Sequence, residues 1–360
     1  MKKWFCFLLV AFLIHGGVLA EEMHTGLDGY IRLDEDFYCL ERDGLYRFEG
    51  TCRQQLCTVE LNVRGGLVCN GETAHALSPQ GEIIRMDLQS GEVTLAEHTT
   101  ADMKMDQIVA YIDGWYYLLG NFSEMSFYTL YALRDGELLP IVDGAGTAFQ
   151  WGENVIVGEY TYDMDSGWLC AVSIKDQRPT VQEISATAYL AAVSSDELYY
   201  WEGVPSADKD IMEDVLLIRL SADRREVLAQ AGTAQFYIRP FFGSFACLIL
   251  NDSNDAAVVS LHDGSVHRMA RDSRDFSAWN YWMEWLADPI AGTVFSYDSN
   301  SGTLYMECDG SNWETSAEYS CDLPANNSVA RNGKNKVLDI YDGVLIYRID
   351  EDDARLYWTM

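Results

Sequence analysis

The chain has 360 residues, of which 48% are hydrophobic and 22% charged, a composition that is ordinary for a globular protein and excludes wholesale disorder. Its formal net charge of −31 excludes sequence-independent binding to nucleic acid, because phosphate contacts require clustered Lys and Arg. The same charge argues against anionic membrane surfaces as partners.

The N-terminal segment has the three parts of a secretory signal peptide. Lys2 and Lys3 form a basic start, residues 4–14 are apolar, and the small-x-small sequence Val18-Leu19-Ala20 precedes two acidic residues. The apolar run falls short of the roughly 20 residues needed to cross a bilayer. We therefore expect a signal peptide over 1–20, no membrane span after cleavage, and an extracytoplasmic location, either secreted or at the cell envelope.

The mature chain, residues 21–360, is expected to form a single domain, since no Pro- or Ser-rich linker divides it. Cleavage removes two lysines and leaves 23 basic against 56 acidic residues, a net charge of −33. Such a charge favours a soluble monomer, with a basic partner or calcium at the cell envelope as the open alternative.

Export permits disulfides, and eight of the nine cysteines lie in the mature chain. Cys52 and Cys57 are close together in a polar segment, and Cys308 and Cys321 flank another, so these are the two candidate bridges. The other four lie in apolar, strand-like runs and are expected to be buried free thiols: Cys39, Cys69, Cys170 and Cys247.

A hairpin pattern recurs along the mature chain. The clearest copies are Leu88-Gln-Ser-Gly91-Glu-Val93, Leu133-Arg-Asp-Gly136-Glu-Leu138 and Leu261-His-Asp-Gly264-Ser-Val266. Asp-Gly and Ser-Gly supply the positive φ that tight hairpin turns demand. Weaker copies lie at Asp176, Asp223 and Asp309-Gly310, and successive copies are 40 to 47 residues apart.

A second, independent pattern is a turn followed by an aromatic or aliphatic strand. Its copies begin at Gly66, Gly114, Gly152, Asp196, Gly243, Gly292 and Gly343, with spacings of 38 to 51 residues. One unit reads as four strands over 108–112, 115–119, 127–133 and 137–142. A period of 40–50 residues with about four strands per unit is typical of a β-propeller. We therefore expect an all-β propeller of four-stranded antiparallel blades.

Seven copies of the second pattern favour seven blades, while surplus strands in 29–60 allow eight. The last unit contains only three expected strands, Val337–Tyr341, Val344–Ile349 and Arg355–Thr359. We expect the N-terminal segment 29–50 to supply the missing strand and close the ring, because closure removes exposed edges.

The repeated Tyr-Tyr strands, the Leu-x-[DS]-Gly hairpins and the ending Leu356-Tyr-Trp-Thr359 make this sequence resemble bacterial exported propellers. Those in turn resemble the Tyr-Trp-Thr-Asp propellers of low-density-lipoprotein-receptor-related proteins. The resemblance covers most of 29–360 and implies the fold and a binding role. The single Tyr-Trp-Thr motif is followed by Met360 where that family has Asp, so no functional residue is carried over.

Enzyme signatures are missing from the sequence. There is no G-x-S-x-G, P-loop, G-x-G-x-x-G or H-E-x-x-H motif. Acidic residues are numerous, so a pair of carboxylates for glycoside chemistry can still assemble in three dimensions. A propeller enzyme acting on carbohydrate, with paired Asp or Glu at the central channel, is therefore the alternative to a binding protein.

Two segments resemble the start of an oxygen-rich calcium loop. They contain Asp163 and Asp165, and Asp298 and Asn300, each followed by Gly two residues later. Neither has the downstream bidentate acid that calcium loops use, and Asp, Asn, Ser and Gly are also common turn residues. The sequence thus favours plain turns and no cofactor, with calcium as the open alternative.

The most unusual segment is rich in aromatic residues and lies between two units. It contains Phe276, Trp279, Tyr281, Trp282 and Trp285. Aromatic side chains of this kind dominate sugar and protein contacts, but they also fill cores. Both interpretations stay open, as a ligand-binding platform or as side chains buried against the blades.

Taken together, these features predict an exported, non-catalytic binding propeller. Its ligand is expected to be a protein or a carbohydrate polymer of the cell envelope, with no nucleic acid involved.

Overall fold

The computed structural model describes most of the chain between residues 23 and 359, namely 23–26, 29–33, 36–49, 52–99, 104–121, 128–158, 167–175, 177–194, 197–205, 212–221, 223–242, 245–250, 256–269, 283–287, 293–298, 303–309, 317–320, 337–341, 344–349 and 353–359. Within these ranges the secondary structure consists of β-strands, and no helix is long and apolar enough to cross a membrane. The predicted signal peptide lies outside them.

The strands form a series of antiparallel sheets that follow one another along the chain. The first contains β2 (Tyr30–Leu33), β3 (Asp36–Glu41), β4 (Gly44–Glu49) and β5 (Cys52–Thr58). The second contains β1 (His24–Gly26), β6 (Leu67–Cys69), β7 (Thr73–Leu77), β8 (Ile83–Asp87) and β9 (Val93–Glu97). The third contains β10 (Lys104–Ile112), β11 (Trp115–Asn121), β12 (Tyr128–Arg134) and β13 (Glu137–Ala145). The fourth contains β14 (Thr147–Trp151), β15 (Asn154–Gly158), β16 (Leu169–Lys175) and β17 (Arg178–Ser185).

The following sheet has seven strands, β18 (Ala188–Ser194), β19 (Glu197–Pro205), β20 (Met212–Leu220), β21 (Arg225–Phe242), β22 (Phe245–Leu250), β23 (Ala256–Ser260) and β24 (Val266–Met269). Its long strand β21 pairs with β20 through its first half and with β22 through its second half. This sheet is therefore two propeller units joined by one continuous strand. The last two sheets are β25 (Met283–Ala287), β26 (Thr293–Asp298), β27 (Thr303–Asp309) and β28 (Ala317–Ser320), then β29 (Val337–Tyr341), β30 (Val344–Ile349) and β31 (Asp353–Thr359).

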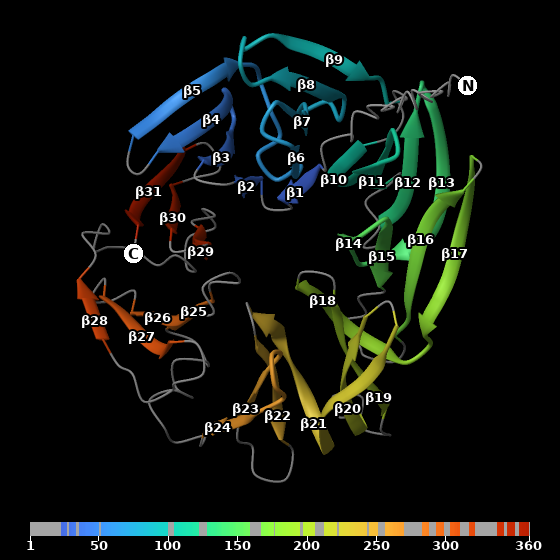
Figure 1. Cartoon of the computed structure of the whole chain (residues 1–360), viewed down its shortest axis with the longest axis vertical. Coiled ribbons are helices and arrows are strands. Elements are labelled where there is room, and N and C mark those ends of the chain that lie inside the picture. Colours follow the sequence, from blue (N-terminus) through green and yellow to red (C-terminus); the bar gives the residue numbers. More distant parts are fainter. Residues whose placement is uncertain are drawn as a thin grey trace, which may run out of the picture.

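Figure 1 shows these sheets arranged in a ring, with the chain running once around it from blue to red. Strands such as β2, β10, β14, β18, β25 and β29 face the middle of the ring. The described strands make up eight units, so the fold is the expected all-β propeller, with the eight blades that the sequence allowed instead of the seven that it favoured.

The ring closes differently from the sequence-based expectation. Residues 30–58 form their own four-stranded sheet, and the last sheet has three strands among the described residues. The short strand β1 pairs with β6 in the second sheet instead, while β3 lies against β31 at the seam. Local hairpins explain the difference, because pairing neighbouring strands closes much shorter loops than exchanging a strand with the far end of the chain.

The hairpin motif was predicted correctly, and it has a packing role that the sequence does not reveal. Gly91 and Gly264 have φ values of +72° each, and a Cβ at either would lie 2.7 Å from a carbonyl oxygen, that of Leu56 or Leu228. At the third copy, the Glu97 carboxylate accepts hydrogen bonds from the backbone N–H groups of the turn at 135 and 136, at 2.8 and 3.0 Å. In each case the hairpin of one blade docks on the outer strand of the blade before it.

Candidate functional site

A pocket of about 590 Å³ lies on the first sheet, at the end where β3 turns into β4 and where β5 ends. Its lining residues carry both signs of charge. The carboxylates come from Glu41, Asp43 and Glu60, the guanidinium groups from Arg42 and Arg53, and the remaining side chains from Tyr46, Thr58 and Val59.

A glycine shapes this end of the sheet. Gly44 is paired with Glu41 across the β3–β4 hairpin and has a φ of +154°. A Cβ at this position would lie 2.0 Å from the carbonyl oxygen of Cys57 on β5. Only glycine therefore allows β4 and β5 to approach closely beneath the pocket.

The centre of the pocket is an ion pair. Glu41 is only 2% exposed, and Arg53 Nε donates to its Oε1 at 2.9 Å while Nη2 donates to Oε2. The same guanidinium lies over the Tyr46 ring, with Cζ 3.8 Å from the ring centroid. A two-pronged hydrogen bond combined with a cation–π contact fixes the orientation of Arg53.

The mouth of the pocket is more exposed and is also internally paired. The Tyr46 hydroxyl lies 3.0 Å from both carboxylate oxygens of Asp43. Burial and then this hydrogen bond raise the pKa of Tyr46 to about 12, so the phenol keeps its proton and remains a donor. Arg42 and Glu60 form a looser pair, 3.9 Å apart, with side chains 63% and 61% exposed.

Three of the described carboxyl groups have a lowered pKa: Asp87 and Asp263 chiefly through backbone N–H groups in hairpin turns, and Glu226 chiefly through the Arg219 guanidinium. A lowered pKa keeps a carboxyl group ionised, whereas a general acid needs a raised one. In the part of the chain that the structure describes, no three His, Cys, Asp or Glu side chains come together as a metal site.

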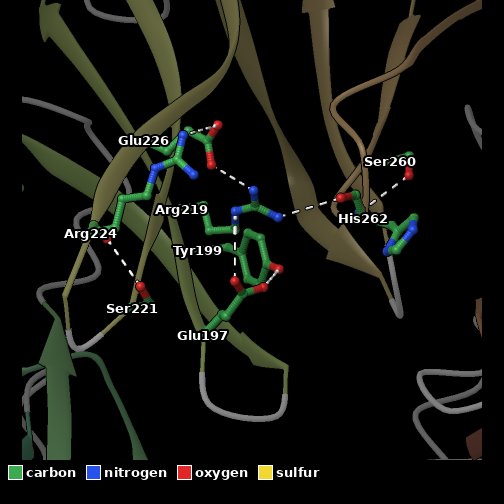
Figure 2. Close-up of polar contacts among 8 residues, drawn as sticks. All are labelled: Glu197, Tyr199, Arg219, Ser221, Arg224, Glu226, Ser260 and His262. Atoms are coloured by element: carbon green, nitrogen blue, oxygen red, sulfur yellow. Dashed lines mark hydrogen bonds and ion pairs between the residues drawn. The ribbon is translucent and has the colours of Figure 1, made fainter.

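Figure 2 shows a second polar cluster, which joins the fifth and sixth units. Arg219 on β20 forms ion pairs with Glu197 at 3.7 Å and with Glu226 at 2.5 Å. It also donates to the backbone carbonyl of His262 at 3.4 Å, and Tyr199 donates to Glu197. Because Arg219 connects β19, β20 and β21 to the β23–β24 hairpin, we assign this cluster to the packing of adjacent blades.

The predicted bridge between Cys52 and Cys57 does not form. Both residues lie on β5, where Cys52 is exposed, Cys57 is buried, and both thiols are free. Five residues along one strand span about 16 Å, far beyond the separation that a disulfide tolerates. Their segment is a strand and not the loop that its polar composition suggested. Cys308 lies on β27 and Cys321 falls outside the described residues.

The predicted buried thiols are confirmed where the structure describes them. Cys39, Cys69 and Cys170 are free and buried. Burial raises the pKa of both Cys69 and Cys170 to about 11, so these two thiols stay protonated and unreactive at neutral pH.

The other predicted site residues lie mostly outside the described ranges. This holds for Phe276, Trp279, Tyr281 and Trp282, and for Asp163, Asp165 and Asn300. Trp285 lies on β25 and Asp298 ends β26. Both the aromatic platform and the calcium interpretation therefore remain predictions.

Sequence reasoning missed the pocket, although one signal for it was present. Arg42-Asp43-Gly44 repeats the Arg134-Asp135-Gly136 triplet of the hairpin motif. That match locates a turn at the correct place. The pairing of Glu41 with Arg53, 12 residues away on β5, depends on the sheet register and is invisible in the sequence.

No protein-family model and no curated protein matches the sequence. Among solved structures, BamB from Moraxella catarrhalis matches with a TM-score of 0.50 and 11% identity, over 94% of this chain and 98% of that one. The WD40 domain of SCAP from fission yeast has a TM-score of 0.49 and 9% identity, over 94% and 95% of the two chains. Apo AztD from Citrobacter koseri has a TM-score of 0.49 and 12% identity, over 86% and 87%. At 11% identity the likeness to BamB is one of fold alone, and it agrees with the ring of sheets: the protein is a β-propeller.

Proposed function

We propose that this protein is an exported propeller that binds a protein or polymer of the cell envelope and carries out no chemistry of its own. The observation that carries the proposal is the Glu41–Arg53 pair, a buried carboxylate held by a guanidinium at the centre of an open pocket with charged lining residues. Groups fixed by each other form a preorganised binding surface.

Several features of the sequence support the same role. The signal-like start and the net charge of −33 after cleavage fit a soluble, extracytoplasmic, monomeric protein comprising residues 21–360 as one domain. The resemblance to Tyr-Trp-Thr-Asp propellers also implies binding. No cofactor is needed for this role.

Site-specific photocrosslinking in producing cells tests the proposal. A photoreactive residue at Glu60, at the pocket mouth, is expected to capture an envelope component, while one at the exposed Glu137 on β13 is not. Equal capture at both positions, or none at either, would contradict a binding role for this pocket. Turnover of an envelope glycan by the purified protein would favour the alternative of a carbohydrate-active enzyme.

The aromatic segment is a second element of the proposal. If Trp282 belongs to a partner-binding platform, Trp282→Ala weakens binding and leaves the melting temperature nearly unchanged. A large loss of melting temperature with intact binding would assign the tryptophans to the core. A thermal-shift comparison in calcium and in EDTA checks the calcium alternative, because a ligand of the native state raises its stability.

A further inference from the structure

We infer that the pocket around Glu41 and Arg53 takes a neutral polyhydroxylated ligand, a sugar residue of an uncharged glycan. This inference rests on the proposed function, because it names the ligand class of the same pocket. Two properties of the lining support it: the ligand charges that the lining disfavours, and the hydrogen-bonding groups that it presents.

The charges of the lining disfavour both anions and cations. An anionic ligand would approach the carboxylates of Glu41, Asp43 and Glu60, on a protein whose net charge is already −31. A cationic ligand would approach the guanidinium groups of Arg42 and Arg53. The buried Glu41 is paired with Arg53, and the exposed Arg42 lies beside Glu60, so these pairs present strong local dipoles to a ligand, a setting that favours a neutral polar molecule.

The lining also disfavours an apolar ligand. Val59 is the only aliphatic side chain among the described lining residues, and it is partly buried. Tyr46 is 5% exposed, and the Arg53 guanidinium lies over its ring. Small-molecule sites for apolar ligands are lined mostly by hydrophobic side chains, whereas five of the eight lining residues here are charged.

The hydrogen-bonding groups match a row of hydroxyl groups. Arg53 already uses Nε and Nη2 on the buried Glu41, so the exposed Arg42 guanidinium and Glu60 carboxylate are the two-pronged groups that can engage adjacent oxygens of a ligand. A hydroxyl group donates and accepts at once, and it can therefore bridge a guanidinium and a carboxylate that lie side by side. Thr58, exposed at the end of β5, adds a neutral hydroxyl to the lining. The volume of about 590 Å³ is within the range of small-ligand sites.

A peptide is the less favoured occupant. Extended peptides are recognised mainly through the backbone of an open strand edge, and side-chain pockets add specificity to that pairing. The present pocket lies at a hairpin end, and its central side chains, Glu41 and Arg53, are held in place by an ion pair. Fixed side chains lose little entropy when a small rigid ring binds.

The test is a calorimetric titration of the mature protein with three oligosaccharides of equal length, one neutral, one built of uronic acids and one built of amino sugars. We expect the neutral glycan to bind most tightly. Arg42→Gln and Thr58→Val should each weaken that binding at least tenfold. Arg224→Gln and Thr94→Val are matched controls, because Arg224 is 69% exposed beside Glu226 and Thr94 is exposed on β9. Both controls should bind like the wild type, and all four variants should keep its melting temperature.

The outcomes separate the inference from the proposed function. Tighter binding of the charged glycans, or neutral binding that ignores the pocket variants, overturns the inference. If no glycan binds while crosslinking through Glu60 still captures a protein, the sugar class is wrong and the binding function stands. If no glycan binds and crosslinking through Glu60 captures no partner, both the inference and the proposed function fail.

Discussion

The Tyr116 hydroxyl lies 2.6 Å from Nδ1 of His75, and this hydrogen bond joins β7 of the second blade to β11 of the third. Tyr111 on β10 packs against both rings, with centroids 5.5 Å from His75 and 4.5 Å from Tyr116. His75 is 6% exposed and Tyr116 is 5% exposed. The contact is therefore a buried polar link inside an otherwise apolar interface between blades.

This link makes stability depend on pH. Burial, and secondarily Arg85, lowers the pKa of His75 from 6.5 to about 4. Between these values the unfolded chain binds a proton that the folded protein does not, so the free energy of unfolding falls as the pH drops from about 6.5 towards 4. The loss over that window is about 3 kcal/mol. Urea denaturation at pH 7 and pH 4.5 measures it.

His75→Gln provides the comparison, because glutamine does not titrate and can still accept the bond from Tyr116. The free energy of unfolding of the wild type, relative to that of His75→Gln, should fall by about 2–3 kcal/mol on going from pH 7 to pH 4.5. His98→Gln is the control, since the His98 side chain is 73% exposed. Parallel pH profiles for the wild type and His75→Gln would contradict the assignment.

A second prediction concerns the hairpins that dock on neighbouring blades. Gly91→Ala places a methyl group against the Leu56 carbonyl, whereas nothing lies within 4 Å of a Cβ at Gly136. Both glycines have positive φ, +72° and +77°, so both variants share a backbone cost of about 1–2 kcal/mol. Gly91→Ala should be about 1–3 kcal/mol more destabilising in chemical denaturation. Equal losses would mean that the β8–β9 hairpin does not dock on β5.

The repeat pattern made most of the fold predictable because turns are local. The strands expected at 108–112, 115–119, 127–133 and 137–142 correspond to β10, β11, β12 and β13.

The number of blades was harder to predict from the sequence than the strands within one blade. The sequence between β2 and β3 of the first blade, Asp34-Glu35, contains no glycine, so this blade escaped the pattern. In the second blade, the copy of the pattern at Gly66 lies before β6. The turn that corresponds to the other copies is Asn70-Gly71, between β6 and β7.

The candidate site was not predictable for a different reason. Its residues lie at 41–46, 53 and 58–60, and only the antiparallel register of β3, β4 and β5 brings them together. A bulge between Leu45 and Tyr46 also shifts that register. Composition indicated a polar segment at 52–57 and suggested a loop, but on an outer strand polar residues face solvent.

A third prediction uses two arginines that share one carboxylate. Arg219 Nη2 and Arg224 Nη2 lie 2.5 and 3.0 Å from the two oxygens of Glu226, with side chains 23% and 69% exposed. Lysine keeps the charge but loses the two-pronged geometry. Arg219→Lys should therefore cost about 1–2 kcal/mol and Arg224→Lys less than about 0.5 kcal/mol. Similar losses of stability for the two variants in thermal unfolding would show that Arg219 contributes no more than an exposed ion pair does.

The last prediction concerns the ion pair in the pocket, whose partners differ in burial. Arg53→Met leaves the Glu41 carboxylate, 2% exposed, without its guanidinium, and should destabilise the protein by about 3 kcal/mol. Glu41→Gln leaves a guanidinium that is 40% exposed and can be hydrated, and should cost only about 1 kcal/mol. In the double variant the buried charge is gone, so this variant should be more stable than Arg53→Met alone. Urea denaturation of the four proteins completes the cycle, and additive losses would mean that Glu41 and Arg53 are not coupled.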